Sequence, residues 1–162
     1  MNGMQDLALI LQDGRKTVAF AESCTGGLLA ERATDLAGSS AWFECSLVTY
    51  SNRAKQELLG VDPVILETDG AVSWGCACAM AEGLMSRTVA DWGISLTGVA
   101  GPGGGSPEKP VGLVWIGWIG RSLPVAAERF DFKGDRQQIR QQAAVAAIAG
   151  LIDRIRTVNV RS

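Results

Sequence analysis

The feature that most constrains the fold is the stretch of residues 17–36, where three patterns follow one another without a break. An apolar run over 17–21 ends in a small polar turn, and a helical pattern begins directly behind it. A strand that leads straight into a helix is the building unit of an α/β sheet. Backbone N–H groups at such a helix start lack intrahelical partners, so the turn suits an anion or a reacting oxygen atom.

The turn itself offers several chemical roles. Ser23, Cys24 and Thr25 are three candidate nucleophiles or hydrogen-bond donors, and Gly26 and Gly27 leave the backbone open to a ligand. A purely structural alternative is that Ser23 or Thr25 caps the following helix.

Helical and strand patterns alternate early in the chain, and a hairpin pattern comes late. The spacing predicts a short opening helix that ends at Gly14, and a final helix that begins at Asp135 with Gln138 at capping-box distance. Between them we expect strands over 17–21, 42–50, 93–97, 111–119 and 125–132, and helices over 28–36, 51–59, 63–68 and 73–85. The apolar residues of 42–50 do not alternate, which is typical of a strand that is buried on both faces. The chain therefore predicts an α/β fold, with a mixed sheet between helical layers and one domain over 1–162.

Composition excludes several classes of function. The 162 residues carry a formal net charge of −2 and a sequence pI near 5.2, which gives no general attraction to nucleic acid or to an anionic membrane. No apolar run approaches ~20 residues and no signal-peptide pattern opens the chain, so we expect a cytoplasmic protein. Histidine is absent, which excludes Ser-His-Asp catalysis and histidine-ligated metals, and the four cysteines form no CxxC pair. We expect reduced, buried thiols, no metal and no cofactor.

Polar residues follow three of the predicted strands. Glu22 and Ser23 follow the first strand, residues 50–52 follow the second, and Thr97 and Gly98 follow the third. In open α/β sheets, ligands bind at the carboxyl ends of the strands. The three strand ends therefore predict one shared site.

A serine nucleophile needs a base, and Lys55 is the candidate in a chain without histidine. To act near pH 7 its pKa must fall by ~3 units from ~10.4, which corresponds to about 4 kcal/mol and is within reach of desolvation. The alternative is that Lys55 is solvated on a helix face. Ser51, four residues before Lys55, is a rival nucleophile, although we expect it to be a helix N-cap.

Two further segments are candidates for anion binding. The turn at 97–101 can present N–H groups to an oxyanion or a phosphate, but the glycine-rich stretch behind it lacks the Gly-Lys-Ser/Thr ending of a P-loop. Arg136, at the start of the last helix, either pairs with a phosphate or is one of several exposed arginines on that helix.

Six motifs in one order give the chain a specific resemblance over about residues 17–151. They are AESCTGG at 21–27, YSNRAK at 50–55, GAVS at 70–73, TGVAGP at 97–102, PEKPVG at 107–112 and GDR at 134–136. With these motifs the chain resembles the CinA C-terminal domain family, whose enzymatic members are nicotinamide-nucleotide amidases. One difference from the family is Asp69, at a position where the family often has histidine. We expect this difference to alter the rim of the pocket.

The resemblance implies a three-layer α/β/α sandwich and hydrolysis of nicotinamide mononucleotide to nicotinic acid mononucleotide and ammonia, without a metal. It implies Ser23 as nucleophile and Lys55 as base, with Tyr50 and Thr97 nearby. The oxyanion is then held by N–H groups of the turn at 23–27 or of the turn at 97–101. The residues predicted to bind substrate are accordingly Thr25, Gly26, Gly27, Thr97, Gly98, Ala100, Gly101 and Arg136.

Two other functions remain open from the sequence. One is a non-catalytic nucleotide-binding or protein-interaction module of the same fold, and the other is a serine–lysine amidase with a different amide substrate. The joint presence of Ser23 and Lys55 favours an enzyme. We also expect a homo-oligomer, because five tryptophans supply apolar surface for an interface: Trp42, Trp74, Trp92, Trp115 and Trp118.

Overall fold

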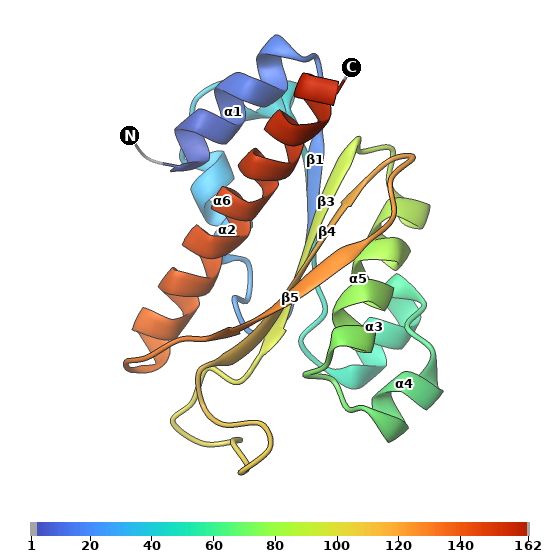
Figure 1. Cartoon of the computed structure of the whole chain (residues 1–162), viewed down its shortest axis with the longest axis vertical. Helices are drawn as coiled ribbons and strands as arrows, with labels where there is room; N and C mark the ends of the chain where they lie inside the picture. Colours follow the sequence, from blue (N-terminus) through green and yellow to red (C-terminus); the bar gives the residue numbers. More distant parts are fainter. Residues whose placement is uncertain (1–2, 162) are drawn as a thin grey trace.

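The computed structural model describes residues 3–161, which are arranged around a five-stranded sheet with the order β2-β1-β3-β4-β5 (Figure 1). The strands are β1 (Val18–Glu22), β2 (Phe43–Val48), β3 (Trp92–Gly98), β4 (Leu113–Gly120) and β5 (Ala126–Asp131). β1 runs parallel to both β2 and β3, whereas β4 is antiparallel to β3 and to β5. The predicted mixed sheet and the late hairpin are confirmed.

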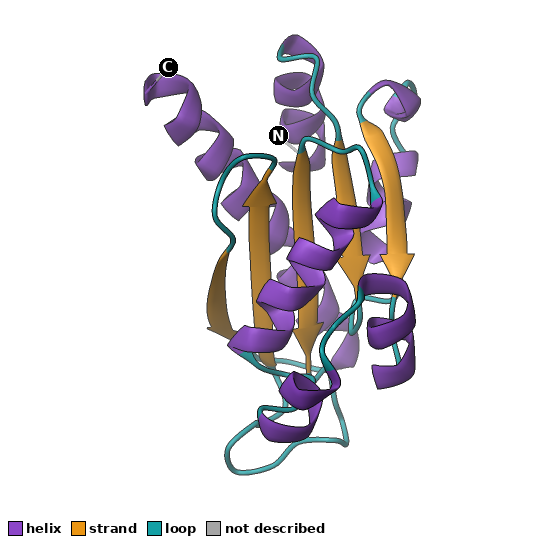
Figure 2. Cartoon of the chain, turned by 90° about the vertical axis from the view of Figure 1, so that its right-hand side faces the viewer, coloured by secondary structure: helices purple, strands orange, loops and turns teal. Residues whose placement is uncertain are grey.

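Helices cover both faces of the sheet, which confirms the three-layer arrangement (Figures 1 and 2). One layer contains α1 (Gly3–Asp13), α2 (Leu28–Thr34) and α6 (Arg136–Arg161), and the other contains α3 (Asn52–Leu59), α4 (Pro63–Thr68) and α5 (Trp74–Arg87). A 3-10 turn, η1 (Ser39–Ala41), precedes β2. None of the helices formed by residues 3–161 is both long enough and apolar enough to span a bilayer.

The alternation of side chains along β1 divides the interior into two cores. Val18 and Phe20 belong to the core beneath α1, α2 and α6, while Ala19 and Ala21 belong to the core beneath α3, α4 and α5. Successive side chains of a strand point to opposite faces, so one buried strand contributes to both. All five residues of β1 are buried, and the strand's last residue, Glu22, leads directly to the polar turn.

The predicted capping box at Asp135 is confirmed, and a serine caps a second helix. The Ser73 hydroxyl accepts from the N–H of Cys76 at the start of α5. Asp135 and Gln138 form a reciprocal capping box at the start of α6, with distances of 2.9 and 2.8 Å. The first turns of α5 and of α6 therefore begin where local side-chain chemistry fixes them.

Two expectations about burial are wrong. β2 was expected to be buried on both faces, but it is a sheet edge whose residues are half-buried or exposed, because it has a neighbouring strand on one side. The tryptophans were expected to supply interface surface, yet Trp42 and Trp118 are fully buried and Trp92 is nearly so, since these large rings fill the core. Trp74 is the exposed one of the five, at 56%.

The position of α3 depends on a close approach to α5. A Cβ atom on Gly83, in the middle of α5, would lie 1.9 Å from the carbonyl oxygen of Leu59 at the end of α3. Glycine normally weakens a helix interior by ~1 kcal/mol relative to alanine. Here the missing side chain allows the backbones of the two helices to touch.

We predict that Gly83→Ala destabilises the protein despite alanine's higher helix propensity. The clash with Leu59 forces α3 away from α5, so the free energy of unfolding in urea should fall by about 2 kcal/mol. Gly103→Ala is the control, because a Cβ on Gly103 meets no atom within 4 Å. A Gly83→Ala variant as stable as the wild type would show that α3 and α5 do not need this contact.

Candidate active site

A pocket of about 210 Å³ opens at the carboxyl ends of β1 and β3, beside the segment that follows β2. Residues that follow three strands thus border one pocket, and their assignment to a functional site stays a prediction. Residues from all three ends line the pocket, together with the start of α6 and the segment before α5: Ser23, Cys24, Tyr50, Asn52, Lys55, Ala71, Val72, Thr97, Gly98, Ala100 and Arg136.

The central contact of the pocket joins Ser23 and Lys55. The Lys55 Nζ lies 3.0 Å from the Ser23 Oγ, although the two residues are 32 positions apart in the sequence. Lys55 is 1% exposed and Ser23 is 8% exposed. The alternative of a solvated lysine on a helix face is wrong, because the first turn of α3 directs this side chain under the end of β1.

Two backbone carbonyls hold the amine of Lys55. Its Nζ donates to the carbonyl oxygens of Thr49, at 2.7 Å, and of Tyr50, at 3.4 Å. Within the described part of the chain no carboxylate forms an ion pair with it. The site thus supplies hydrogen-bond acceptors to the amine without a neutralising charge.

Burial lowers the pKa of Lys55 from its ordinary value, because desolvation penalises the ammonium form. Ionised thiols at Cys24 or Cys76 would oppose this shift. Burial, however, raises the pKa of each of these cysteines to about 11, so both are neutral near pH 7. Neutral thiols add no negative charge to hold the proton on Lys55.

The other candidate nucleophiles are placed differently. Cys24 borders the pocket, but its buried thiol ionises only near pH 11. Thr25 is fully buried, and its Oγ1 has no hydrogen-bond partner among residues 3–161. Ser51 is exposed and accepts from the Ala54 N–H at 3.0 Å, so it is the N-cap of α3, as expected.

The turn at 23–27 has fewer available N–H groups than the sequence indicates. Gly26 donates to the Ser23 carbonyl oxygen, and Gly27 donates to the Glu22 carboxylate. Both glycines have left-handed φ values, of 59° and 98°, so their role in the observed structure is to shape the turn. Within residues 3–161 the N–H groups of Cys24 and Thr25 donate to no carbonyl oxygen, although the Cys24 N–H lies beside its own thiol.

The turn at 97–101 also borders the pocket, through Thr97, Gly98 and Ala100. Thr97 donates its hydroxyl hydrogen to the Ala71 carbonyl oxygen at 2.7 Å, which ties the end of β3 to the segment before α5. At Gly98, a Cβ would lie 2.6 Å from the Val114 side chain, so glycine is needed at that position. In the described chain, Ala100 likewise has an N–H group without a protein acceptor.

Arg136 and Tyr50 meet at the rim. Arg136 donates to the Tyr50 hydroxyl oxygen at 3.0 Å and to the Gly101 carbonyl oxygen at 2.7 Å. Arg136 is exposed, and Tyr50 is 61% exposed, so this cation is accessible from solvent. Both readings of Arg136 made from the sequence, an exposed residue and a phosphate-binding one, are compatible with this position.

Three pocket residues, Ala71, Val72 and Asn52, belong to the GAVS and YSNRAK motifs, but the sequence gives them no chemical role of their own. Ala71 and Val72 line the pocket with apolar side chains, and Asn52 follows the N-cap serine, where a helix start alone accounts for it. Conversely, Thr25, Gly26, Gly27 and Gly101 do not line it. Asp69 also lies outside the lining, where its carbonyl oxygen accepts from Lys109.

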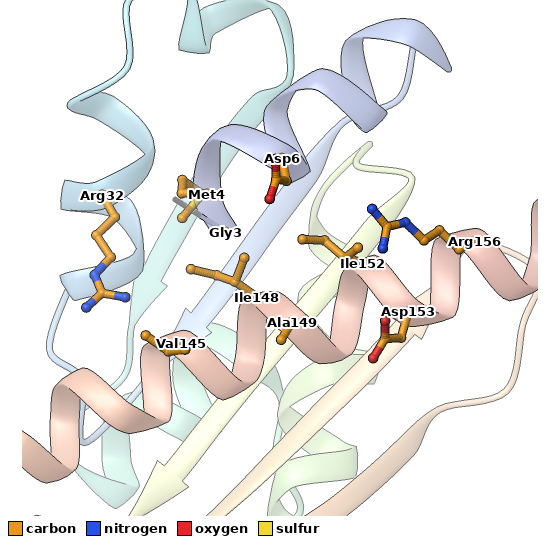
Figure 3. A pocket seen from close by; sticks show the side chains of 10 residues that line it. All are labelled: Gly3, Met4, Asp6, Arg32, Val145, Ile148, Ala149, Ile152, Asp153 and Arg156. Carbon is orange, nitrogen blue, oxygen red and sulfur yellow. The ribbon is translucent and has the colours of Figure 1, made fainter. Parts of the chain in front are cut away.

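A second cavity, of about 240 Å³, lies between α1, α2 and α6 (Figure 3). It is lined by the charged residues Asp6, Arg32, Asp153 and Arg156 together with apolar residues such as Ile148, and none of its lining residues is a serine, threonine, cysteine or lysine. No group of three or more His, Cys, Asp or Glu side chains that could hold a metal occurs among residues 3–161. This second cavity therefore offers neither a nucleophilic side chain nor a lysine.

Known proteins similar to this chain share its sequence over most of its length. A family model described as the CinA C-terminal domain matches residues 2–155. A CinA-like protein of Chlorobaculum tepidum is 52% identical over 152 residues, which are 91% of this chain and 36% of that protein. The nicotinamide-nucleotide amidohydrolase PncC of Enterobacter agglomerans is 53% identical over 131 residues, which are 81% of this chain and 80% of that protein. The chain thus spans about a third of the first relative and four-fifths of the second.

Solved structures are similar as well. The competence/damage inducible protein CihA from Agrobacterium tumefaciens is 40% identical, with a TM-score of 0.88 over 94% of this chain and 96% of that one. A CinA superfamily protein from Klebsiella pneumoniae is 32% identical, with a TM-score of 0.91 over 97% of this chain and 99% of that one.

The buried amine predicts a specific pH dependence of stability. Lys55 has a lowered pKa in the folded protein and its ordinary value in the unfolded chain, so between these two values the unfolded chain binds one proton more. The free energy of unfolding of the wild type, relative to that of Lys55→Met, should therefore rise with pH by up to about 1.4 kcal/mol per unit. This rise with pH begins at the lowered pKa of Lys55 in the folded protein and ends near the ordinary lysine pKa of 10.5. Urea titrations at a series of pH values measure this slope, and a flat or falling difference would contradict the burial of a neutral amine.

Proposed function

Because the chain belongs to the CinA C-terminal domain family, we propose that it is a nicotinamide-nucleotide amidase with a serine–lysine mechanism. It hydrolyses nicotinamide mononucleotide to nicotinic acid mononucleotide and ammonia. The observation that carries this proposal is the 3.0 Å contact between the Ser23 Oγ and the buried Nζ of Lys55. The names of the PncC relatives support the choice of substrate.

Ser23 is the nucleophile and neutral Lys55 is the general base. In the neutral amine two N–H bonds donate to the carbonyl oxygens of Thr49 and Tyr50, which leaves the lone pair for the Ser23 hydroxyl hydrogen. As Ser23 Oγ forms a bond to the carboxamide carbon, its proton moves to Lys55. The C=O π electrons move to the oxygen, and a tetrahedral intermediate results.

The N–H groups of Cys24 and Thr25, which donate to no carbonyl oxygen of residues 3–161, hold the oxyanion of this intermediate. They follow the nucleophile directly in the chain, and Cys24 borders the pocket. Pre-positioned N–H donors of this kind stabilise the charge that develops on the oxygen in the transition state.

The intermediate then breaks down in two steps. Protonated Lys55, directly or through the nearby Tyr50, returns the proton to the departing nitrogen, so the C–N bond breaks and ammonia leaves. Lys55, neutral again, removes a proton from a water molecule, which attacks the acyl-enzyme and releases the carboxylate product. The bond between the substrate carbon and Ser23 Oγ breaks, Ser23 takes back the proton that Lys55 removed from the water, and the cycle needs neither a metal nor a redox cofactor.

The nucleotide part of the substrate lies toward the rim. Arg136 is the accessible cation there, and we assign it to the substrate phosphate, with Thr97, Gly98 and Ala100 along the same wall. Residues 1–162 act as one amidase domain in this proposal. It also includes a homo-oligomer, for which Trp74 supplies exposed apolar surface on α5.

Ser23→Ala is the direct test of the nucleophile. Purified protein incubated with nicotinamide mononucleotide should release ammonia, and Ser23→Ala should lower the turnover number at least ~10³-fold because no covalent intermediate forms. Ser51→Ala is the matched control: it removes the other serine near Lys55, which caps α3, and should cost about 1 kcal/mol of stability with turnover retained. Loss of turnover in Ser51→Ala but not in Ser23→Ala would assign the nucleophile to Ser51.

Lys55→Arg separates a base from a phosphate-binding cation. Arginine keeps the positive charge but does not deprotonate in this range, so turnover should fall about as far as in Lys55→Ala. Adding either change to Ser23→Ala should lower turnover little further, since the two residues act as a unit. A Lys55→Arg variant with normal turnover and a raised Michaelis constant would instead mean that Lys55 binds the phosphate.

A further inference from the structure

Glu22 is a buried charged residue that the proposed mechanism leaves unused. It ends β1, directly before the nucleophile, and is 0% exposed. It does not line the pocket. Among the described residues no lysine or arginine forms an ion pair with it. Burial of a carboxylate without a cation is costly unless hydrogen bonds compensate for the lost water.

Four hydrogen bonds provide that compensation. The Oε2 atom accepts from the N–H groups of Gly27 and Leu29, each at 3.1 Å. The Oε1 atom accepts from the Ala30 N–H at 3.1 Å and from the Ser46 hydroxyl at 2.9 Å. Both carboxylate oxygens are thus occupied by donors from the start of α2 and from β2.

These hydrogen bonds link the end of β1 to the start of α2 across the turn that contains Ser23. The Glu22 side chain reaches past residues 23–26 to the backbone of α2, while the Ser23 N–H donates to the Leu96 carbonyl oxygen of β3 at 3.0 Å. Ser23 is therefore fixed on one side by the sheet and on the other by the anchored helix. The carboxylate also accepts from the first N–H groups of α2, whereas in the described chain the N–H groups of Cys24 and Thr25 donate to no carbonyl or carboxylate oxygen.

We propose that Glu22 is a positioning residue that acts through Ser23: its carboxylate fixes the turn at 23–27 so that the Ser23 Oγ stays at hydrogen-bonding distance from Lys55. This inference rests on the proposed function, because it assigns Glu22 a role in the same reaction. Displacement of a reacting atom by about 1 Å can cost ~10²-fold in rate. A residue that sets the geometry of the turn therefore governs turnover without touching the substrate.

A purely structural role makes a different prediction. If Glu22 only capped α2, its loss would reduce stability, and the molecules that remain folded would turn over substrate normally. If Glu22 positions Ser23, each folded molecule of the variant turns over substrate more slowly. The turnover number then falls, while the Michaelis constant changes little.

Three variants distinguish these roles. Glu22→Gln keeps the shape but presents an amide N–H₂ to one pair of donors. Ser46→Ala removes one donor from the same carboxylate. Asp62→Asn is the control, since Asp62 accepts from the Val64 N–H at the start of α4, and neither residue lines the pocket. For each variant, circular dichroism and urea titration give the folded fraction, and steady-state ammonia release gives the turnover number and the Michaelis constant per folded molecule.

We expect Glu22→Gln to lower the turnover number about 100-fold, with the Michaelis constant within about threefold of the wild type. Ser46→Ala should lower it about threefold with the same signature, because one hydrogen bond is lost from four. Asp62→Asn should leave both constants unchanged. Normal turnover per folded molecule in both Glu22→Gln and Ser46→Ala would overturn the proposal. If Glu22→Gln does not fold, normal turnover in Ser46→Ala is sufficient to overturn the proposal.

A second measurement separates this inference from the proposed function. The rate at which a fluorophosphonate labels Ser23 reports the reactivity of the serine without the nucleotide substrate. If the wild type is labelled but releases no ammonia from nicotinamide mononucleotide, the proposed substrate is wrong, and slower labelling of Glu22→Gln still supports the positioning role. If the wild type is neither labelled nor active, Ser23 is not a nucleophile and both proposals fail.

Discussion

The burial of the Lys55 amine beside Ser23, without a carboxylate partner, is the interaction on which the rest of the site depends. An isolated ammonium group at that depth would be unfavourable, so burial lowers the pKa of Lys55. The carbonyl oxygens of Thr49 and Tyr50 hold the amine in place, and the neighbouring thiols are neutral. A chain without histidine obtains in this way a base that can act on a serine.

The sheet supplies the geometry that this pair requires. β1 lies parallel between β2 and β3, so three strand ends meet at one edge. α3 carries Lys55 beneath that edge, where the contact between Gly83 and Leu59 lets it pack closely against α5. The nucleophile and the base therefore come from neighbouring strand ends, and their separation is set by packing across the sheet.

Much of this arrangement could be predicted from the sequence because it depends on local chemistry. Strand, turn and helix follow one another without a break around Ser23, and the caps at Ser51, Ser73 and Asp135 fix the helix boundaries. What could not be predicted depends on contacts between distant residues. The sequence does not show that β2 is an edge strand, or that the Glu22 carboxylate accepts from the N–H groups at the start of α2.

The central claim, that a neutral Lys55 amine faces Ser23 in the working protein, is open to direct observation. Side-chain ¹⁵N NMR of lysine-labelled protein, recorded as a function of pH, distinguishes a neutral amine from an ammonium group at the Nζ atom, and Lys55→Met assigns the signal. The proposed mechanism requires a Lys55 resonance that titrates well below 10.5 and is that of a neutral amine at the pH where ammonia is released. A resonance that remains that of an ammonium group throughout the active pH range would contradict it.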